Sequence, residues 1–167
     1  SEGKKVLLWD IFVHNMDVVR DMLQLRINGP IELVNGSVSG LERQAAIKRF
    51  RAGKSMVLLA NPATLAESIS LHKACQNAIY INKNFNAAQF MQSKDRIHRI
   101  NMPEGTTAHY YFIENKNSVD AIVRERLIKK EKRMLAILDS DELVIGGAEM
   151  EDTNIMSYKD VIEAFMR

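Results

Sequence analysis

Two arginines, Arg96 and Arg99, lie three residues apart in the stretch QSKDRIHR, residues 92–99, which has helix-forming spacing. At this spacing both guanidinium groups project from one face of a helix. A guanidinium is permanently charged and fork-shaped, so such a pair suits a phosphate chain that carries several negative oxygens. A solvated basic face on a surface helix explains the same pattern, and the pair alone does not decide between the two.

No other pattern in the chain completes a phosphate-handling site. Gly53-Lys54-Ser55 imitates the end of a phosphate-binding loop, but Lys48 stands where that motif needs its first glycine. The expected order of elements is also inverted, with a helix before and a strand after. The histidines and the single cysteine show no metal-ligand spacing. We therefore expect a phosphate clamp without a metal site or a nucleotide cradle of its own.

Short apolar runs alternate with helical patterns along the chain. We expect strands over residues 6–9, 31–34, 56–60, 78–81 and 108–113. We expect helices over residues 14–25, 39–50, 87–98 and 118–138. The second helix opens on a capping box, Ser39-x-x-Glu42. Because the strands are apolar throughout, this order predicts a three-layer α/β/α sandwich with a mostly parallel sheet covered on both faces. Ligands of such sheets gather at the carboxyl ends of the strands.

Composition and charge narrow the classes of protein to which this chain can belong. Hydrophobic residues make up 46% and charged residues 26% of the 167 positions, as in soluble globular proteins. No apolar run approaches a membrane span, and the lone Cys75 fits a reducing compartment, so we expect a cytoplasmic protein without a membrane partner. Residues 1–138 carry 21 basic and 13 acidic side chains, a net +8, whereas residues 139–167 carry 2 and 8, a net −6. We expect a main domain over 1–138 and an acidic linker with a short helix over 139–167.

Four ordered segments resemble known helicase motifs. KVLLWDIF at 5–12 is similar to motif IV, and NGSVS at 35–39, with Arg43 and Phe50 after it, resembles the segment that follows. VLLAN through SISL, residues 57–71, resembles motif V, and the stretch at 92–99 matches motif VI, Gln-x-x-(Gly/Asp)-Arg-x-x-Arg. Over roughly residues 4–138 the chain thus resembles the C-terminal RecA-like lobe of a superfamily-two helicase of the Swi/Snf-like kind, a P-loop-NTPase-like fold without its own P-loop.

The resemblance implies roles for individual residues. Arg96 and Arg99 correspond to arginine fingers that reach ATP and Mg bound mainly on an N-terminal lobe, and Gln92 to the glutamine that helps organise that cleft. Residues implied on the ATP-cleft side are Ser68, Ser70 and Asp95. Residues implied to contact the nucleic-acid backbone are Asp10, Ser37, Arg43 and Asn61. Turn and cap chemistry also explains the polar residues Ser37, Asn61, Ser68 and Ser70.

Three departures from the Swi/Snf-like pattern point to a divergent bacterial or phage branch. Motif V is about two residues longer around ATLAE at 63–67, Asn101-Met102 replaces the usual Gly-Gln, and Asn82 stands where an aspartate is common.

The resulting prediction is the C-terminal motor lobe of an ATP-dependent DNA helicase or translocase. Its expected partners are the N-terminal RecA-like lobe of the same parent protein and DNA, with RNA not excluded. The lobe alone is expected to be inactive. The alternative is a non-catalytic RecA-like scaffold that binds nucleic acid or protein.

Overall fold

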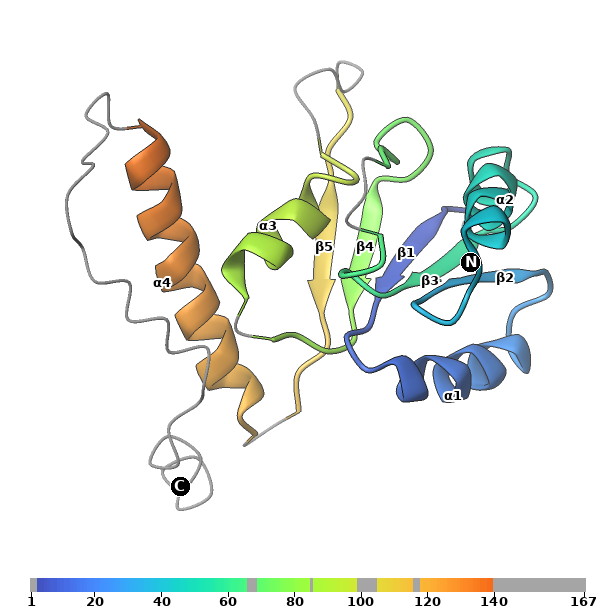
Figure 1. The fold of residues 1–167 in the computed structure, drawn as a ribbon, viewed down its shortest axis with the longest axis horizontal. Helices are drawn as coiled ribbons and strands as arrows, with labels where there is room; N and C mark the ends of the chain where they lie inside the picture. The colour runs from blue at the N-terminus through green and yellow to red at the C-terminus, as the bar shows by residue number, and fades with distance from the viewer. Residues whose placement is uncertain (1–2, 66–68, 85, 99–104, 116–117, 140–167) are drawn as a thin grey trace. The chain divides into compact units, whose positions relative to one another are not determined.

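The computed structural model describes residues 3–65, 69–84, 86–98, 105–115 and 118–139 (Figure 1). The chain forms two compact units, a main unit of residues 1–83 and 89–113 and a second unit of residues 84–88 and 114–167. Within the described ranges, no helix has both the length and the apolar character needed to cross a membrane.

Strands and helices alternate as the sequence predicts. The strands are β1 (Val6–Trp9), β2 (Ile31–Val34), β3 (Val57–Ala60), β4 (Asn77–Tyr80) and β5 (His109–Phe112). The helices are α1 (Val13–Gln24), α2 (Gly40–Arg51), α3 (Ala87–Lys94) and α4 (Asp120–Asp139). All five predicted strands are confirmed to within one residue at each end. Residues 52–56 join α2 to β3, so Gly53-Lys54-Ser55 follows a helix and precedes a strand, the inverse of a phosphate-binding loop.

The strands form one sheet in the order β2-β3-β1-β4-β5, and every pairing is parallel (Figure 1). Val6 at the start of β1 is level with Val57 of β3 and with Asn77 of β4. All five carboxyl ends therefore lie along one edge of the sheet, and the loops that follow them share that edge.

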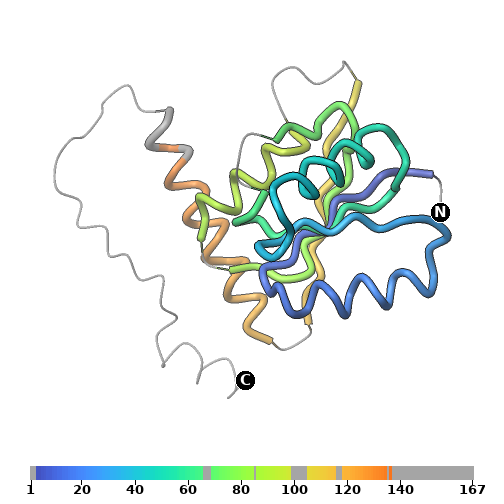
Figure 2. The backbone as a smooth tube through the Cα atoms, turned by 45° about the vertical axis from the view of Figure 1, so that its right-hand side comes forward, coloured from blue at the N-terminus to red at the C-terminus, as the bar shows by residue number. Residues whose placement is uncertain are grey.

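Alternating side chains of the strands pack into two separate hydrophobic cores, one on each face of the sheet. Leu7 and Trp9 of β1 pack with α2 residues, including Phe50, and with Phe90 of α3. Leu8, between them, packs instead with Met16 of α1 and its neighbours. Figure 2 follows the chain through these layers, with α1 on one side of the strands and α2 and α3 on the other. The predicted α/β/α sandwich is confirmed, with a wholly parallel sheet.

Two expectations about individual elements are wrong. Helix α3 ends at Lys94 rather than near His98, and the chain continues in a turn over residues 95–97. Strand β5 forms an edge of the sheet and is not buried on both faces, since Tyr111 is 53% exposed. Face burial depends on what packs against the sheet, so an apolar run is not by itself evidence of burial on both faces.

Helix α4 belongs to the second unit and is fixed at its start by local polar contacts. The Asp120 carboxylate accepts hydrogen bonds from the Asn115 backbone N–H at 2.9 Å and from the Ser118 hydroxyl at 2.8 Å. The Lys129 ammonium lies 2.7 Å from the Glu125 carboxylate one turn away and lowers the pKa of Glu125. The predicted domain boundary at residues 138/139 stays a prediction, because residues 140–167 lie outside the described part of the chain.

Candidate nucleotide and nucleic-acid site

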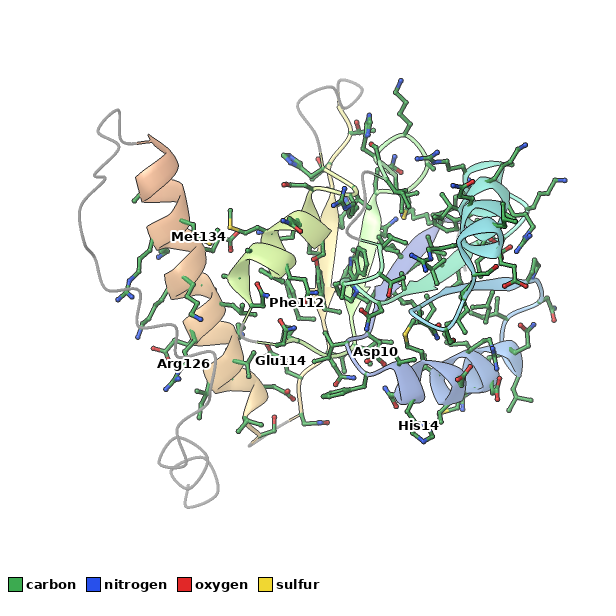
Figure 3. All side chains as sticks on the ribbon, viewed as in Figure 1. Asp10, His14, Phe112, Glu114, Arg126 and Met134 are labelled. Atoms are coloured by element: carbon green, nitrogen blue, oxygen red, sulfur yellow. The ribbon has the colours of Figure 1, made fainter. Side chains whose placement is uncertain are left out.

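Asp10 follows β1 directly and is fully buried at the carboxyl edge of the sheet (Figure 3). Its Oδ1 accepts hydrogen bonds from the Phe12 backbone N–H at 2.9 Å and from Asn82 Nδ2 at 3.0 Å. Its Oδ2 accepts a third from Asn15 Nδ2 at 2.6 Å. These bonds connect the β1–α1 loop, the first turn of α1 and the loop after β4. The buried carboxylate thus holds these segments of the carboxyl edge together. Its predicted contact with nucleic acid stays a prediction.

Asn61 takes a comparable position at the end of β3 and is 7% exposed. Its side-chain amide donates to the Ile11 carbonyl at 3.0 Å, while its side-chain oxygen accepts from the Ala63 backbone N–H at 2.9 Å. The backbone N–H of Asn61 also donates to the Val34 carbonyl of β2 at 2.9 Å. Asn61 thus connects the loop after β1, the end of β2 and the loop after β3.

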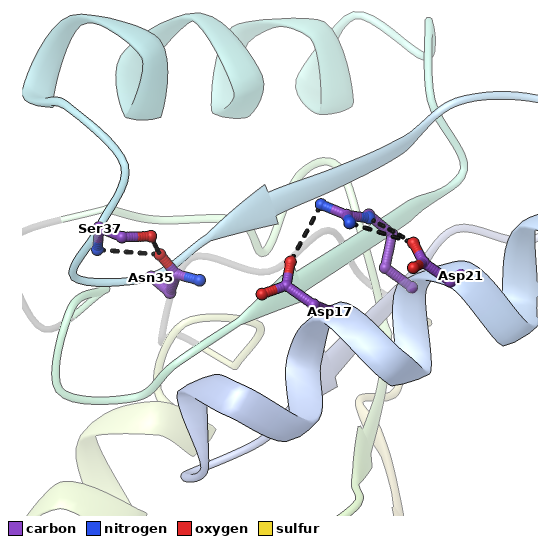
Figure 4. Close-up of polar contacts among 5 residues, drawn as sticks. Asp17, Asp21, Asn35 and Ser37 are labelled. Atoms are coloured by element: carbon purple, nitrogen blue, oxygen red, sulfur yellow. Dashed lines mark hydrogen bonds and ion pairs between the residues drawn. The ribbon is translucent and has the colours of Figure 1, made fainter.

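Ser37 and Arg43 lie beyond β2 on the same edge. The Ser37 hydroxyl donates to Asn35 Oδ1 at 2.6 Å, and the Ser37 backbone N–H donates to the same oxygen at 3.0 Å (Figure 4). Arg43, in the first turn of α2, donates from Nη2 to the Val38 carbonyl at 3.1 Å. Ser37 is exposed and Arg43 is half-buried. Of the four residues predicted to contact the nucleic-acid backbone, these two are the more accessible to a ligand.

Arg96 lies in the turn after α3, not on the helix face that its spacing suggested. It is only 8% exposed. Its carbonyl accepts a hydrogen bond from the Leu71 backbone N–H at 2.7 Å, and its guanidinium makes a long contact of 3.5 Å from Nη1 to the Ile69 carbonyl. Ser70 follows Ile69 in the chain, and its carbonyl accepts a hydrogen bond from Arg51 Nη2 at 2.7 Å. The motif VI-like arginine therefore meets the motif V-like segment directly.

Aromatic packing holds α3, and with it the turn that carries Arg96. The Tyr80 ring at the end of β4 lies 5.2 Å from the Phe90 ring and 5.1 Å from the Phe112 ring, between centroids. The Tyr80 hydroxyl is 2.7 Å from Ser93 Oγ, and the Tyr110 hydroxyl donates to the Lys94 carbonyl at 2.9 Å. Contacts along the last turn of α3 thus fix where the helix stops.

The predicted site residues consequently form two groups. One group follows the carboxyl ends of the strands and contains Asp10, Ser37, Arg43 and Asn61. The other surrounds the contact between Arg96 and the Ile69–Ser70 segment, with Gln92 and Asp95 exposed nearby in the chain. Arg99 and Ser68 lie outside the described residues.

Three residues that the motif comparison did not select take part in these groups. Asn15 and Asn82 donate to Asp10, and Arg51 holds Ser70. Asn82 carried a signal in the sequence, because it opens the loop after a strand. Arg51 carried none, since 19 residues separate it from Ser70 and only the fold brings the two together.

The profile of the helicase conserved C-terminal domain matches residues 1–101, more than half of the chain. The chain belongs to this helicase C-terminal domain family. The prediction of a RecA-like C-terminal lobe from a superfamily-two helicase is thereby confirmed.

Relatives of this helicase lobe include proteins named for chromatin remodelling and for a chromodomain with a helicase. Protein CHROMATIN REMODELING 4 of Arabidopsis thaliana is 29% identical over 163 residues, which is 95% of this chain and 7% of that protein. Chromodomain-helicase-DNA-binding protein 1-like of Mus musculus is 28% identical over 148 residues, 88% of this chain and 16% of that protein. The lobe thus spans a small part of these relatives, which are eukaryotic; the bacterial or phage branch stays a prediction.

Among solved structures, the C-terminal part of the Fun30 ATPase domain matches this lobe with a TM-score of 0.65. The sequence identity is 21%, and the match covers 74% of this chain and 39% of that one. At this identity the likeness shows the fold alone. It agrees with the five-stranded parallel sheet and confirms the predicted fold class.

Proposed function

We propose that this helicase lobe is the C-terminal half of an ATP-dependent DNA translocase or helicase motor. In this proposal ATP and Mg are bound mainly by an N-terminal RecA-like lobe of the same parent protein. Arg96 and Arg99 then reach the ATP phosphates across the cleft between the lobes when it closes.

The burial of Arg96 carries the proposal. A solvated basic face requires an exposed side chain, and Arg96 is 8% exposed. A guanidinium packed inside the lobe beside the motif V-like segment favours electrostatic stabilisation of a phosphoryl transfer, because the charge is held by the fold before the reaction begins. An arginine finger of this kind is worth roughly 10³–10⁵ in rate in other nucleotide hydrolases.

The carboxyl edge of the sheet supports the second half of the proposal, contact with the nucleic-acid backbone. Arg43 of α2 offers a half-buried guanidinium there, and the exposed Ser37 lies in the loop before α2, where Asn35 holds its hydroxyl and backbone N–H. Phosphate contacts of this type carry no sequence information, which suits a motor that moves along any sequence.

The test uses the longer natural protein that contains this lobe. We expect Arg99→Ala to lower DNA-stimulated ATP hydrolysis by about 10³-fold or more, the loss expected for an arginine finger. The Kd for ATP should change little, because the N-terminal lobe supplies most of the binding contacts. Arg96→Lys should lose most of the activity as well, since an ammonium lacks the planar fork of a guanidinium.

Arg133→Ala on the exposed side of α4 serves as the control and should leave hydrolysis unchanged. Melting temperatures of all variants show whether the lobe still folds. If folded Arg99→Ala and Arg96→Lys proteins both hydrolyse ATP at the normal rate, the arginines are not fingers. The scaffold alternative would then describe the lobe better.

A further inference from the structure

A cleft of about 440 Å³ lies on the main unit beside the Ile69–Ser70 segment. Two permanently charged side chains, Arg51 and Lys73, line it together with Ser70, His72 and Ala74. Small-ligand sites in proteins are of this order of volume. The helicase motifs account only for Ser70.

One wall of the cleft is the end of α2, where Arg51 is held in position from two directions. Its Nη2 donates to the Ser70 carbonyl at 2.7 Å, and its own carbonyl accepts from Lys5 Nζ at 3.0 Å. The Lys5 ammonium lies 5.6 Å from the centre of the Phe50 ring. A guanidinium has five N–H donors, so a single bond to Ser70 leaves others for a ligand.

The other wall is the turn that leads into β4. The Leu71 carbonyl accepts from the backbone N–H groups of Ala74 at 2.8 Å and Cys75 at 2.9 Å, which closes the turn. His72 is buried, with Nδ1 hydrogen-bonded to the Ser70 hydroxyl, and its carbonyl accepts from Gln76 Nε2 at 3.1 Å. Lys73, between these fixed residues, remains exposed to solvent.

The permanent charges on the residues that line the cleft have one sign, since Arg51 and Lys73 are both positive and no lining residue is acidic. Arg20 and Arg49 are neutralised by carboxylates at 3.1 Å and 2.7 Å. Among the residues that the structure describes, neither Arg51 nor Lys73 pairs with a carboxylate. A concave surface lined by one sign of charge concentrates ligands of the opposite sign.

We propose that this cleft binds a phosphate group, with Arg51 and Lys73 supplying the charge. The rigid fork of Arg51 suits two phosphate oxygens, and the flexible ammonium of Lys73 a third. This proposal rests on the proposed function in one respect. A motor lobe encounters two kinds of molecule that carry phosphate groups. These are the triphosphate of a nucleotide and the backbone of a nucleic acid.

The experiment compares two double variants of this chain. Arg51→Gln with Lys73→Gln removes both cleft charges, while Arg26→Gln with Lys132→Gln removes two exposed charges elsewhere. One arm measures anisotropy of a dye-labelled duplex of 20 base pairs across a salt series. The other measures binding of inorganic tripolyphosphate by calorimetry. Arg51→Lys keeps the charge, and melting curves report folding.

We expect the cleft double variant to raise the Kd about tenfold in one arm, and the control pair to raise it less than twofold. If the duplex is the ligand, the slope of log Kd against log salt falls by about 2, since each neutralised phosphate contributes about 0.9. If only tripolyphosphate binding weakens, the cleft faces the nucleotide.

If the two double variants change the Kd equally, or if the cleft variant changes the Kd in neither arm, the proposal that the cleft binds phosphate is wrong. The outcome is separable from that of the motor proposal. Normal hydrolysis by both the Arg99→Ala and the Arg96→Lys protein refutes the arginine fingers and has no bearing on phosphate binding in the cleft. Conversely, intact phosphate binding by the cleft variant refutes the cleft and leaves the fingers standing.

Discussion

The Asp10 carboxylate connects three segments of the carboxyl edge that are distant in the sequence. Its partners come from the β1–α1 loop, from α1 and from the loop after β4, 72 residues away at Asn82. A buried carboxylate is tolerated only when its lone pairs are satisfied, and here three donors satisfy them. At the residue scale, Asp10 therefore fixes the β1–α1 loop and the start of α1 relative to the loop after β4.

We expect Asp10→Asn to destabilise the lobe by about 1–3 kcal/mol, the usual cost of leaving buried polar groups unsatisfied. The new amide places an N–H donor against either Asn15 or Asn82, both of which already donate to Asp10. Urea unfolding followed by circular dichroism measures the loss.

Asp17→Asn on α1 is the matched control. Asp17 is 54% exposed and pairs with Arg20 at 3.1 Å (Figure 4), and exposed pairs of this kind contribute about 0–1 kcal/mol. If both variants unfold at the same urea concentration, the cluster around Asp10 does not have the stabilising role assigned to it.

Helix α2 illustrates how local sequence and tertiary contacts combine at the scale of an element. Ser39 caps its start, with Oγ accepting from the Glu42 backbone N–H at 3.3 Å and donating to the Glu42 carboxylate at 2.9 Å. Near its end, Arg49 donates two bonds of 2.8 Å and 2.7 Å to the buried Glu32 of β2, which raise the pKa of Arg49. Both ends of α2 are thereby fixed, including the wall of the cleft at Arg51.

Ser39→Ala should cost about 1 kcal/mol in the free energy of unfolding, because the first turn loses its side-chain acceptor. Ser39→Thr keeps an acceptor and should cost much less. Chemical denaturation of both variants tests the cap. A Ser39→Ala protein as stable as the wild type would show that packing alone fixes this helix end.

The strands and the α2 cap could be predicted from the sequence because both depend on local patterns. The end of α3 could not. Its helical spacing continues past Lys94, but the Arg96 carbonyl accepts from the Leu71 N–H, which belongs to a loop more than 20 residues earlier. The exposure of β5 depends on which parts of the sheet other elements cover, which the run of apolar residues does not encode.

At the scale of the whole molecule, the predicted site residues form two groups rather than one. Motif spacing selected Asp10, Asn61 and Arg96 because each follows a recognisable element. It could not show that Asp10 and Asn61 are buried, nor that Arg51, Ser70 and Lys73 line a common cleft. Burial and convergence depend on tertiary packing, which brings together residues far apart in the chain.

The central claim is that this lobe completes an ATP site whose other half lies on a second lobe. DNA-stimulated ATP hydrolysis, measured at equal concentration on this chain alone and on the proposed longer protein that joins it to an N-terminal RecA-like lobe, tests it most directly. The account predicts no turnover above background for the chain alone and DNA-dependent turnover for the longer protein. Robust hydrolysis by this chain alone would contradict it.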